Sequence, residues 1–594
     1  MCGIVGAIAK RDVTALLLDG LKRLEYRGYD SAGIAVIDAK GGLQRTRRAG
    51  KISALESALS ENPHPGNIGI AHTRWATHGK PSEKNAHPFA SREQFAVVHN
   101  GIIENHALLK QELLAAGYEF SSDTDSEVIV HLLHFYHEET NDFLMTVQKT
   151  VSRLEGAFAL AILNTKDPDK IIAVRHGSPL VIGKSAGENF VASDPMALLP
   201  LTREFVYLEE NDIAILDISG VSILNGTEKN GKPVSRSVHV LTEQSDFTDR
   251  GEHRHFMRQE IFSQPRAILS CLSGSFPEKI PGLNNISHIC FIACGTSYHA
   301  ALVARYWLEE IAGIACSVEI ASEYRYRNAV IPENTLAVFI SQSGETADTL
   351  AALRLVKEKT ATLAICNVAE SSLVREADSH FLTRAGAEIG VASTKAFTTQ
   401  LVALLRLAFE ISGQTQKMLP QLLQLPDIIR ETLTLDEKIR LLASQFTTKH
   451  HALFMARDSL FPIALEGALK LKEISYIHAE GYPAGELKHG PLALVDPDMP
   501  VIALAPNNTL FAKICSGLQE VSARGGRLYV LTDNPKAITT MDKNIEVIAV
   551  PKTDPLLAPI VYTIPLQLLA YHVAVLKGTD VDQPRNLAKS VTVE

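Results

Sequence analysis

The sequence predicts a multidomain protein of the α/β class, in which a strand-rich mixed α/β domain precedes two doubly wound domains with parallel sheets. The chain has 594 residues. A chain of this length is too long for a single hydrophobic core, so about two to four domains are expected. Short apolar runs separated by turn-rich loops dominate residues 1–240, as in strand-rich domains. Strand-loop-helix units then recur in series, an order typical of parallel sheets.

The first domain is predicted from apolar runs and one helix signal. Runs at residues 33–37, 95–98 and 157–162 have the length and composition of β-strands. Helical periodicity begins near residue 128, and Thr124 with Glu127 has the spacing of a capping box at the start of that helix. Residues 241–260 are polar and indicate a linker. A helical segment is expected over residues 254–272.

The rest of the chain contains a repeat in pattern rather than in identity. In the first copy, strands at residues 288–294 and 336–340 each lead through a loop into a helix, and strands at residues 452–455 and 501–504 do the same in the second copy. Only the first-copy loops are rich in hydroxyls and glycine. Hydroxyls and backbone amides at a helix N-terminus can hold a phosphate, although Ser and Thr are also common N-caps. We expect the phosphate site in the first copy.

Composition argues against several classes of partner. The chain has 58 Lys and Arg against 67 Asp and Glu, for a net charge of −9, which gives no broad electrostatic reason to bind nucleic acid or an anionic membrane. Seven scattered cysteines without a CxxC pair suit reduced thiols in the cytoplasm. Residues 3–9 lack the basic flank of a signal peptide. Residues 558–576 are apolar but contain Pro565, Gln567 and His572, which favours a buried helix of a soluble domain over a membrane span.

Two motifs suggest sites that we do not expect. Among the histidines of the first domain, three share one predicted helix at a spacing of three: His131, His134 and His137. A zinc-binding helix needs a spacing of four, so ordinary hydrogen-bonded histidines are favoured over a metal site. Residues 226–232 match most of a phosphate-binding P-loop, but Pro233 stands where the motif needs Ser or Thr. Residues 230–231 favour a hairpin turn instead.

The chain opens on Met1-Cys2-Gly3. If Met1 is removed, Cys2 carries a thiol and a free α-amino group together. Their reference pKa values are about 8.5 and about 7.7–8.0, so the amine can act as the base for its own sulfur near neutral pH. Cys2 is therefore a candidate nucleophile, although a small residue in an apolar first strand would look the same.

Seven stretches carry a resemblance to a known family. They are residues 2–6, 24–33, 72–79, 99–105, 341–346, 486–491 and 582–594. With these stretches the chain resembles, over its whole length and in the family's order, the isomerizing glutamine:fructose-6-phosphate aminotransferases. The resemblance implies the conversion of D-fructose 6-phosphate and L-glutamine to D-glucosamine 6-phosphate and L-glutamate, the first step of amino-sugar synthesis. It implies no metal and no cofactor.

The resemblance also implies a domain organisation. An N-terminal-nucleophile hydrolase domain, an αββα sandwich with glutaminase activity, is expected over residues 1–240. A linker and helical segment would follow at residues 241–284. Two SIS sugar-isomerase domains are expected at residues 285–425 and 450–580, with a catalytic tail at residues 581–594. A homodimer through the SIS domains is expected, as in the family.

By the same resemblance, Cys2 attacks the glutamine side-chain amide and releases ammonia. Asn100 and the backbone amide of Gly101 would stabilise the oxyanion. Arg74 would bind the substrate carboxylate and Asp125 its ammonium group. The remaining residues implied around this pocket are Thr77, His78 and His87 as lining, Arg27 and Tyr29 in a closing loop, and Trp75 as the gate of a dry ammonia channel.

At the sugar site, the resemblance implies phosphate binding by Ser341, Gln342, Ser343 and Thr346. The residues that would complete the sugar pocket are Thr296, Ser297 and Ser393. Lys589 would form a Schiff base with the opened ketose, and His489 would assist ring opening. Glu473 would move the proton between C1 and C2, with Lys470 nearby. Without the resemblance, a surface ion pair would explain Lys470 and Glu473 at a spacing of three.

Two alternatives belong to other classes. A sugar-phosphate sensor with an inert glutaminase half would need none of the reactive groups named above. Another Cys-initiated amidotransferase, such as one making phosphoribosylamine, predicts a phosphoribosyltransferase-type second half, which the strand-loop-helix repeat contradicts.

Overall fold

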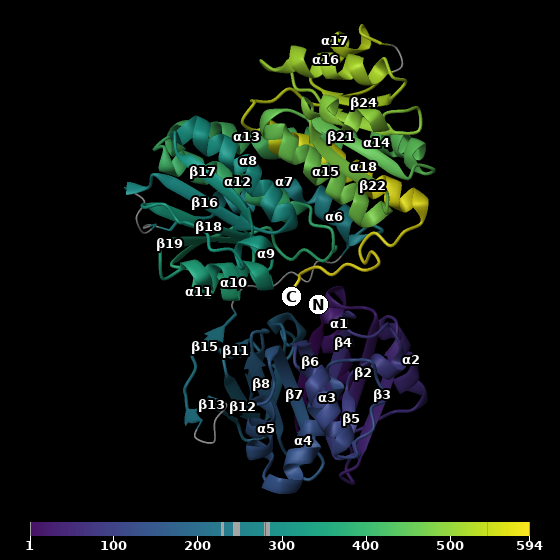
Figure 1. Cartoon of the computed structure of the whole chain (residues 1–594), viewed down its shortest axis with the longest axis vertical. Helices are drawn as coiled ribbons and strands as arrows, with labels where there is room; N and C mark the ends of the chain where they lie inside the picture. Colours follow the sequence, from purple (N-terminus) through teal and green to yellow (C-terminus); the bar gives the residue numbers. More distant parts are fainter. Residues whose placement is uncertain are drawn as a thin grey trace. The chain divides into compact units, whose positions relative to one another are not determined.

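The computed structural model describes residues 2–226, 231–241, 250–277, 280, 285–542 and 545–592. By their contacts, the residues fall into two compact units. The first is Met1–Gln244 with Ala588–Glu594, and the second is Ser245–Leu587. Figure 1 colours the chain from purple at the N-terminus to yellow at the C-terminus.

The N-terminal unit contains two antiparallel sheets. The eight-stranded sheet has the order β15-β11-β9-β10-β1-β4-β2-β3, and the seven-stranded sheet has the order β14-β13-β12-β8-β7-β6-β5. The strands of the first are β1 (Gly3–Ile8), β2 (Ser31–Ile37), β3 (Leu43–Ala49), β4 (Ile68–Arg74), β9 (Val181–Ser185), β10 (Glu188–Ala192), β11 (Glu204–Tyr207) and β15 (Val238–Val240). Those of the second are β5 (Phe89–Ser91), β6 (Phe95–Ile103), β7 (Gly156–Asn164), β8 (Ile171–His176), β12 (Asp212–Leu216), β13 (Val221–Asn225) and β14 (Lys232–Pro233).

Strand β1 shows how the layers form. Ile4 and Ile8 belong to the apolar core between the two sheets, whereas Val5 and Ala7 belong to a core beneath two helices, because successive side chains of a strand point to opposite faces. These helices are α1 (Thr14–Leu24) and α2 (Ile52–Glu61). A third core joins the other sheet to α3 (His106–Ala115), α4 (Glu127–Thr140) and α5 (Phe143–Val151). The unit is therefore the expected αββα sandwich.

Two local predictions for this unit have definite outcomes. The capping box was wrong: α4 begins at Glu127, and the Glu127 carboxylate accepts hydrogen bonds from the backbone of Ser121 and Ser122 rather than from Thr124. The hairpin in place of a P-loop is confirmed at its flanks, since β13 and β14 pair antiparallel. Residues 227–230 of that motif lie outside the described residues.

The C-terminal unit contains two parallel five-stranded sheets with the orders β17-β16-β18-β19-β20 and β22-β21-β23-β24-β25. The order is the same in both, which confirms the repeat. The strands of the first are β16 (His288–Ala293), β17 (Ala315–Ile320), β18 (Thr335–Ser341), β19 (Ala361–Cys366) and β20 (Ser379–Leu382). Those of the second are β21 (His451–Ala456), β22 (His478–Pro483), β23 (Pro500–Leu504), β24 (Arg527–Thr532) and β25 (Glu546–Ala549).

Helices cover both sheets, and one large core joins the two repeats. The helices of the first repeat are α8 (Gly295–Ala312), α9 (Ala321–Tyr324), α10 (Ala347–Val356), α11 (Ser372–Glu376) and α12 (Lys395–Ile411). Between the repeats lie α13 (Thr415–Leu433) and α14 (Asp436–Ala443). The second repeat has α15 (Phe461–Ser475), α16 (Phe511–Ser522), α17 (Pro535–Thr539) and α18 (Ala558–Lys577).

The helical segment expected over residues 254–272 is helical in the structure, as two helices, α6 (Phe256–Phe262) and α7 (Gln264–Ser273). The segment divides into two helices because Pro265 lies in the first turn of α7, where its ring starts a helix but cannot continue one. Met257, Ile261 and Ile268 pack into the core of the C-terminal unit.

Helix α18 is the long apolar segment near the end of the chain. Among the described residues it is the one helix with the length and composition to cross a membrane, yet 89% of its apolar window is buried inside the structure. This agrees with the prediction of a buried domain helix.

Candidate active sites

Cys2 lies directly before β1, beside the end of β4, because β1 and β4 are neighbours with Gly3 opposite Thr73. The backbone N–H of Trp75 donates to Cys2 Sγ at 3.4 Å, and the thiol lies 3.5 Å from the Trp75 carbonyl oxygen. Burial raises the pKa of the Cys2 thiol, while the charged N-terminus and Arg74 oppose that shift. The thiol is thus held by backbone atoms, and its ionisation depends on nearby positive charge.

Arg74, the last residue of β4, is 3% exposed. One terminal nitrogen, Nη2, donates to the carbonyl oxygens of His78 and Gly79. The other, Nη1, is buried and has no hydrogen-bond partner among the residues that the structure describes. Burial lowers the pKa of Arg74, but a guanidinium stays charged in proteins. A buried guanidinium nitrogen without a partner favours an anionic ligand at this position.

Asn100 and Gly101 lie on β6, in the other sheet. The Asn100 side-chain Nδ2 donates to the Cys2 carbonyl oxygen at 3.1 Å. Gly101 has φ of +135°, and a Cβ there would lie 1.9 Å from the Ala157 carbonyl oxygen, so this position excludes every side chain. The structure therefore brings Asn100 to Cys2, and the backbone at Gly101 depends on glycine.

Asp125 is 3% exposed. Its Oδ2 accepts the Ile103 backbone N–H at 2.8 Å, and its Oδ1 lies 3.3 Å from the Ser126 hydroxyl. The attraction between Asp125 and Arg74 opposes the lowering of the arginine pKa. A buried carboxylate and a buried guanidinium thus occur in one unit with Cys2, as a zwitterionic amino acid would require.

The other residues expected at this pocket differ in burial and in hydrogen bonding. Within the described ranges, His78 Nδ1 and both ring nitrogens of His87 are buried without hydrogen-bond partners. Burial lowers the pKa of His87. Thr77 is exposed and Trp75 is half-buried. Arg27, expected in a closing loop with Tyr29, is buried and paired with Asp194.

The three histidines of α4 have hydrogen-bonding partners. The Nδ1 atoms of His131, His134 and His137 lie 2.8–3.0 Å from hydroxyls of Ser91, Tyr118 and Thr146, respectively. Among the described residues, no cluster of three or more His, Cys, Asp or Glu side chains has an arrangement that could hold a metal ion.

The loop of residues 341–346 connects β18 to α10. The Ser341 hydroxyl accepts the Gly344 backbone N–H at 3.0 Å and lies 3.3 Å from the Thr346 hydroxyl, and Ser343 accepts the Glu345 N–H at 3.2 Å. A hydroxyl that accepts one hydrogen bond can still donate its own hydrogen to an anion. This loop therefore brings together hydroxyls expected to bind phosphate, at the carboxyl end of the sheet where doubly wound folds bind ligands.

A buried polar cluster joins α8 of the first repeat to α15 of the second. Glu466 Oε1 accepts the Thr296 hydroxyl at 3.0 Å, and Lys470 Nζ donates to the same hydroxyl at 3.1 Å. Lys470 lies 2.7 Å from Glu473 Oε2 and 3.4 Å from Glu466 Oε1. Burial would lower the pKa of Lys470, but Glu466 and Glu473 together raise it. Lys470 is 1% exposed at its side chain, so a surface ion pair does not describe it.

Ser393 has a partner that the sequence did not indicate. Its hydroxyl donates to Glu388 Oε2 at 2.9 Å, while Glu388 Oε1 accepts the backbone N–H groups of Thr394 and Ala396. Glu388 thus occupies the N-terminus of α12, because a carboxylate there satisfies amides that a helix leaves unpaired. Ser297, also expected at the pocket, accepts from Gln400 at 3.1 Å.

Among the described residues, no contact joins the His489 side chain to this cluster. His489 is exposed. Lys589 is half-buried in the segment Ala588–Glu594, which groups with the N-terminal unit. Gln342 is half-buried in the loop of residues 341–346.

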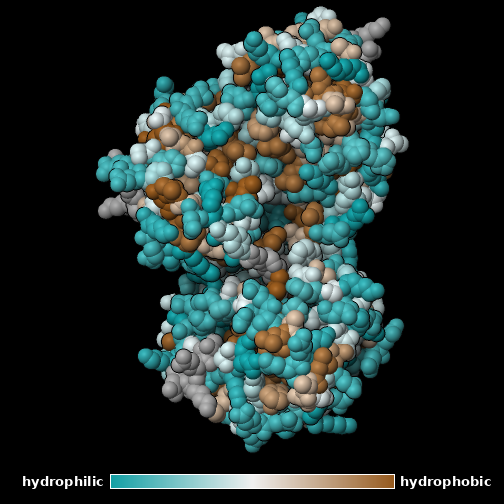
Figure 2. Space-filling model, in the orientation of Figure 1, coloured by the Kyte–Doolittle hydropathy of each residue, from teal (hydrophilic) through white to brown (hydrophobic). Residues whose placement is uncertain are grey.

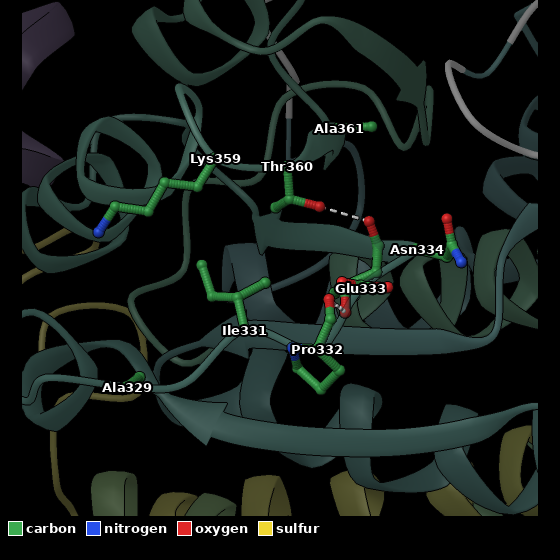
Figure 3. A pocket seen from close by; sticks show the side chains of 9 residues that line it. Ala329, Ile331, Pro332, Glu333, Asn334, Lys359, Thr360 and Ala361 are labelled. Atoms are coloured by element: carbon green, nitrogen blue, oxygen red, sulfur yellow. Dashed lines mark hydrogen bonds between the residues drawn. The ribbon is translucent and has the colours of Figure 1, made fainter.

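A cavity of about 470 Å³ lies elsewhere in the first repeat, lined by residues including Glu333, Asn334, Lys359 and Thr360 (Figure 3). It lies at the amino ends of β18 and β19, whereas the 341–346 loop follows the carboxyl end of β18. The sugar site is therefore not assigned to this cavity.

Sequence reasoning missed four residues that hold these sites together: His72, Asp30, Glu466 and Glu388. His72 contacts Asn100, and Asp30 Oδ2 accepts the Ala76 N–H at 2.7 Å. Glu466 could have been found from its spacing of four before Lys470 on one helix face. Glu388 carries no such signal, because its contacts depend on the loop before α12.

Comparisons with known proteins find relatives of both parts of the chain. A SIS domain model matches residues 282–409 and 445–577, and a glutamine amidotransferase domain model matches residues 72–200. The chain is 55% identical over 612 residues to a Legionella pneumophila (strain Paris) protein named glutamine–fructose-6-phosphate aminotransferase (isomerizing), with both chains fully covered. A Pseudomonas syringae pv. tomato protein of the same name is 56% identical over 615 residues, again with full coverage of both. The solved C-terminal domain of the glucosamine-fructose-6-phosphate aminotransferase from Francisella tularensis is 48% identical, with a TM-score of 0.54, and the match covers 56% of this chain and 100% of that one.

Proposed function

Because the chain belongs to the family of isomerizing glutamine–fructose-6-phosphate aminotransferases, we propose that it converts D-fructose 6-phosphate and L-glutamine to D-glucosamine 6-phosphate and L-glutamate. The observation that carries the glutaminase half is the arrangement of Cys2 with the Trp75 N–H, Asn100 Nδ2 and the buried, unpartnered Nη1 of Arg74.

In the first step, the Cys2 sulfur attacks the side-chain amide carbon of glutamine, and a C–S bond forms. The C–N bond then breaks, ammonia leaves, and water hydrolyses the thioester to glutamate and free thiol. Asn100 Nδ2 and the Gly101 amide stabilise the oxyanion, Arg74 binds the α-carboxylate and Asp125 the α-ammonium group. Removal of Met1 places the α-amine on Cys2 itself, where it serves as the base.

In the second step, the hydroxyls of the 341–346 loop bind the sugar phosphate, and Lys589 forms a Schiff base at C2 of the open-chain ketose with loss of water. Ammonia then adds at C2 and displaces the Lys589 amine, so that C2 carries the imine of ammonia. The proton transfer that follows leaves an aldehyde at C1 and an amine at C2. Glu473 takes a proton from C1 and returns it at C2. Lys470 stands 2.7 Å from Glu473, so its charge favours the ionised, basic form of this carboxylate. Thr296, Ser297 and Ser393 complete the pocket, and His489 assists ring opening.

We propose three further properties, which concern the ammonia path, the cellular location and the oligomeric state. Ammonia passes through a dry channel with Trp75 as gate, because bulk water would protonate and dilute it. The protein works in the cytoplasm, and it is a homodimer through the SIS domains. Apolar patches on the face of the C-terminal unit in Figure 2, and exposed Tyr326, Val330, Leu423 and Leu441 on that unit, are compatible with association.

The experiment that tests the proposal uses glutamine labelled with ¹⁵N in its side-chain amide, with fructose 6-phosphate as acceptor. Mass spectrometry should find the label in glucosamine 6-phosphate. Cys2→Ala should abolish this product and still interconvert hexose phosphates, whereas Cys515→Ala, which changes a thiol of the other unit, should behave as wild type. Sugar binding without turnover would instead indicate a sensor.

A further inference from the structure

His72 lies near the end of β4 and crosses from one sheet of the sandwich to the other. Its side chain is fully buried. The ring nitrogen Nε2 lies 3.0 Å from Asn100 Oδ1 and 3.1 Å from the His99 carbonyl oxygen, both on β6. The other ring nitrogen, Nδ1, is buried and has no hydrogen-bond partner in the described part of the chain.

These two contacts determine where the ring proton lies. The His99 carbonyl oxygen can only accept a hydrogen bond, so Nε2 must carry the hydrogen. A protonated Nε2 can be shared between two acceptors, but it repels an NH₂ group. The side-chain atom of Asn100 that faces His72 must therefore be the oxygen, which settles the orientation of an amide whose two ends are otherwise nearly equivalent.

The orientation of the Asn100 amide matters at the other end of the side chain. With Oδ1 turned to His72, Nδ2 is directed to Cys2, where one of its hydrogens bonds the Cys2 carbonyl oxygen at 3.1 Å. The second hydrogen is available to an oxyanion. If the amide were reversed, an oxygen would face the negative charge of the tetrahedral intermediate and destabilise it.

We propose that His72 is a positioning residue for glutamine hydrolysis. Its Nε2–H is hydrogen-bonded to the His99 carbonyl oxygen and to Asn100 Oδ1, and it thereby holds the Asn100 amide with its N–H donors toward the oxyanion. The inference rests on the proposed glutaminase function. His72 is not placed as a general base, since Nε2 is bound to two acceptors. Burial lowers its pKa to about 3, so the ring is neutral at physiological pH.

The test compares two isosteric and neutral replacements in the full-length protein. In His72→Gln, an amide N–H can replace the ring donor, whereas His72→Met offers no donor. We expect His72→Met to lower kcat for glutamine hydrolysis about a hundredfold with KM changed less than about threefold, and His72→Gln to recover about tenfold or more of that loss. Alkylation of Cys2 by iodoacetamide needs no oxyanion donor and should stay within about twofold of wild type for both.

A double-mutant cycle with Asn100→Ala separates positioning from general damage. Once the Asn100 amide is absent, His72→Met should cause no further loss of kcat. Three results would overturn the proposal. The first is an equal loss of kcat in both backgrounds, and the second is a wild-type kcat in His72→Met. The third is slow alkylation of Cys2 in a variant that retains hexose-phosphate isomerisation. If His72→Met fails to fold, the same cycle with His72→Gln decides, because any loss that it causes must also vanish without Asn100. Absence of glutamine hydrolysis in the processed wild type would instead refute the proposed function.

Discussion

His299 Nδ1 lies 2.7 Å from Glu466 Oε2 and joins α8 to α15, two helices that follow the first strand in each of the two repeats. Glu466 is 1% exposed. Burial would raise the pKa of its carboxyl, but Lys470, His299 and Thr296 together hold it below the ordinary value. The carboxylate is thus ionised, and it links a residue of the first repeat to the lysine beside Glu473 in the second.

Glu466→Gln should therefore slow sugar isomerisation about tenfold or more. Without the Glu466 carboxylate, Lys470 has Glu473 as its one carboxylate neighbour within the cluster and binds it more tightly. Tighter binding to Lys470 weakens Glu473 as a base. Conversion of fructose 6-phosphate to glucose 6-phosphate measures the effect. Glutamine hydrolysis should be unchanged. Glu437→Gln, which removes an exposed carboxylate of α14 paired with Arg440, is the control and should change neither rate.

The same substitution gives a prediction for stability. Breaking a buried ion pair costs up to about 3–5 kcal/mol, so Glu466→Gln should lower the melting temperature at neutral pH. Because the folded pKa of Glu466 is depressed, its contribution is present above the unfolded pKa of about 4.3 and is lost as the pH falls through the folded value. The difference in melting temperature from wild type should shrink in acid. A difference that grows below about pH 4 would contradict an ionised Glu466.

Arg74→Lys should raise KM for glutamine about a hundredfold or more, since an ammonium cannot replace the two-pronged guanidinium whose Nη1 is buried without a partner. Steady-state glutamine hydrolysis measures this effect. Iodoacetamide alkylation of Cys2 checks that the thiol is intact. Arg11→Lys, at an exposed pair with Glu188 in the same unit, should leave KM as in wild type. An unchanged KM in Arg74→Lys would remove Arg74 from the substrate site.

The sequence was sufficient to predict the repeat of the two parallel-sheet domains and the side chains that a short loop brings together. Equal strand orders in the two parallel sheets follow from the recurring strand-loop-helix pattern. Ser341 and Thr346 come together because only four loop residues lie between them. By contrast, the contacts of Glu466 with Thr296 and His299 join two helices, and those of Glu388 cross a loop. Sequence spacing encodes neither set of contacts. The capping box at Thr124 failed because the Glu127 carboxylate instead accepts the backbone N–H groups of Ser121 and Ser122, six and five residues earlier. These local hydrogen bonds compete with those of a capping box.

Lys589→Ala should abolish glucosamine 6-phosphate formation and spare glutamine hydrolysis, if Lys589 forms the Schiff base. Borohydride in the presence of fructose 6-phosphate should then fix a sugar phosphate to the wild-type chain, seen as a mass increase, and not to the variant. Lys513→Ala, at an exposed position of α16, is the matched control and should be labelled as wild type. Labelling of Lys589→Ala would assign the Schiff base to another lysine.

The rate at which iodoacetamide alkylates Cys2 should depend on whether Met1 is present. Burial raises the pKa of the thiol, so in the chain that retains Met1 the midpoint of alkylation should lie above the ordinary thiol value of about 8.5. Only the thiolate reacts. Removal of Met1 brings the α-amine next to the sulfur, where it can take the thiol proton, so Cys2 of the processed chain should be alkylated at lower pH. Intact mass gives the processing state of each sample. Equal midpoints in the two forms would argue against the amine as the base.

Gly344→Ala tests the phosphate loop. Gly344 has φ of +67°, and a Cβ there would lie 2.1 Å from Ser371 Oγ and 2.4 Å from Ser371 Cβ. Gly313, at the end of α8, has nearly the same φ of +66° but no atom within 4 Å of its Cβ position. Both substitutions cost about 1–2 kcal/mol for the left-handed backbone, whereas only Gly344→Ala must also displace α11 or the loop.

We therefore expect Gly344→Ala to raise KM for fructose 6-phosphate about tenfold or more, because its N–H fixes the Ser341 hydroxyl at 3.0 Å and a shifted loop misdirects the donors to phosphate. Gly313→Ala should lower the melting temperature and leave this KM near wild type. Isomerisation kinetics with thermal melts of both variants measure the two effects. If both variants raise KM equally, general loss of stability explains the result, and the loop of residues 341–346 is not the phosphate site.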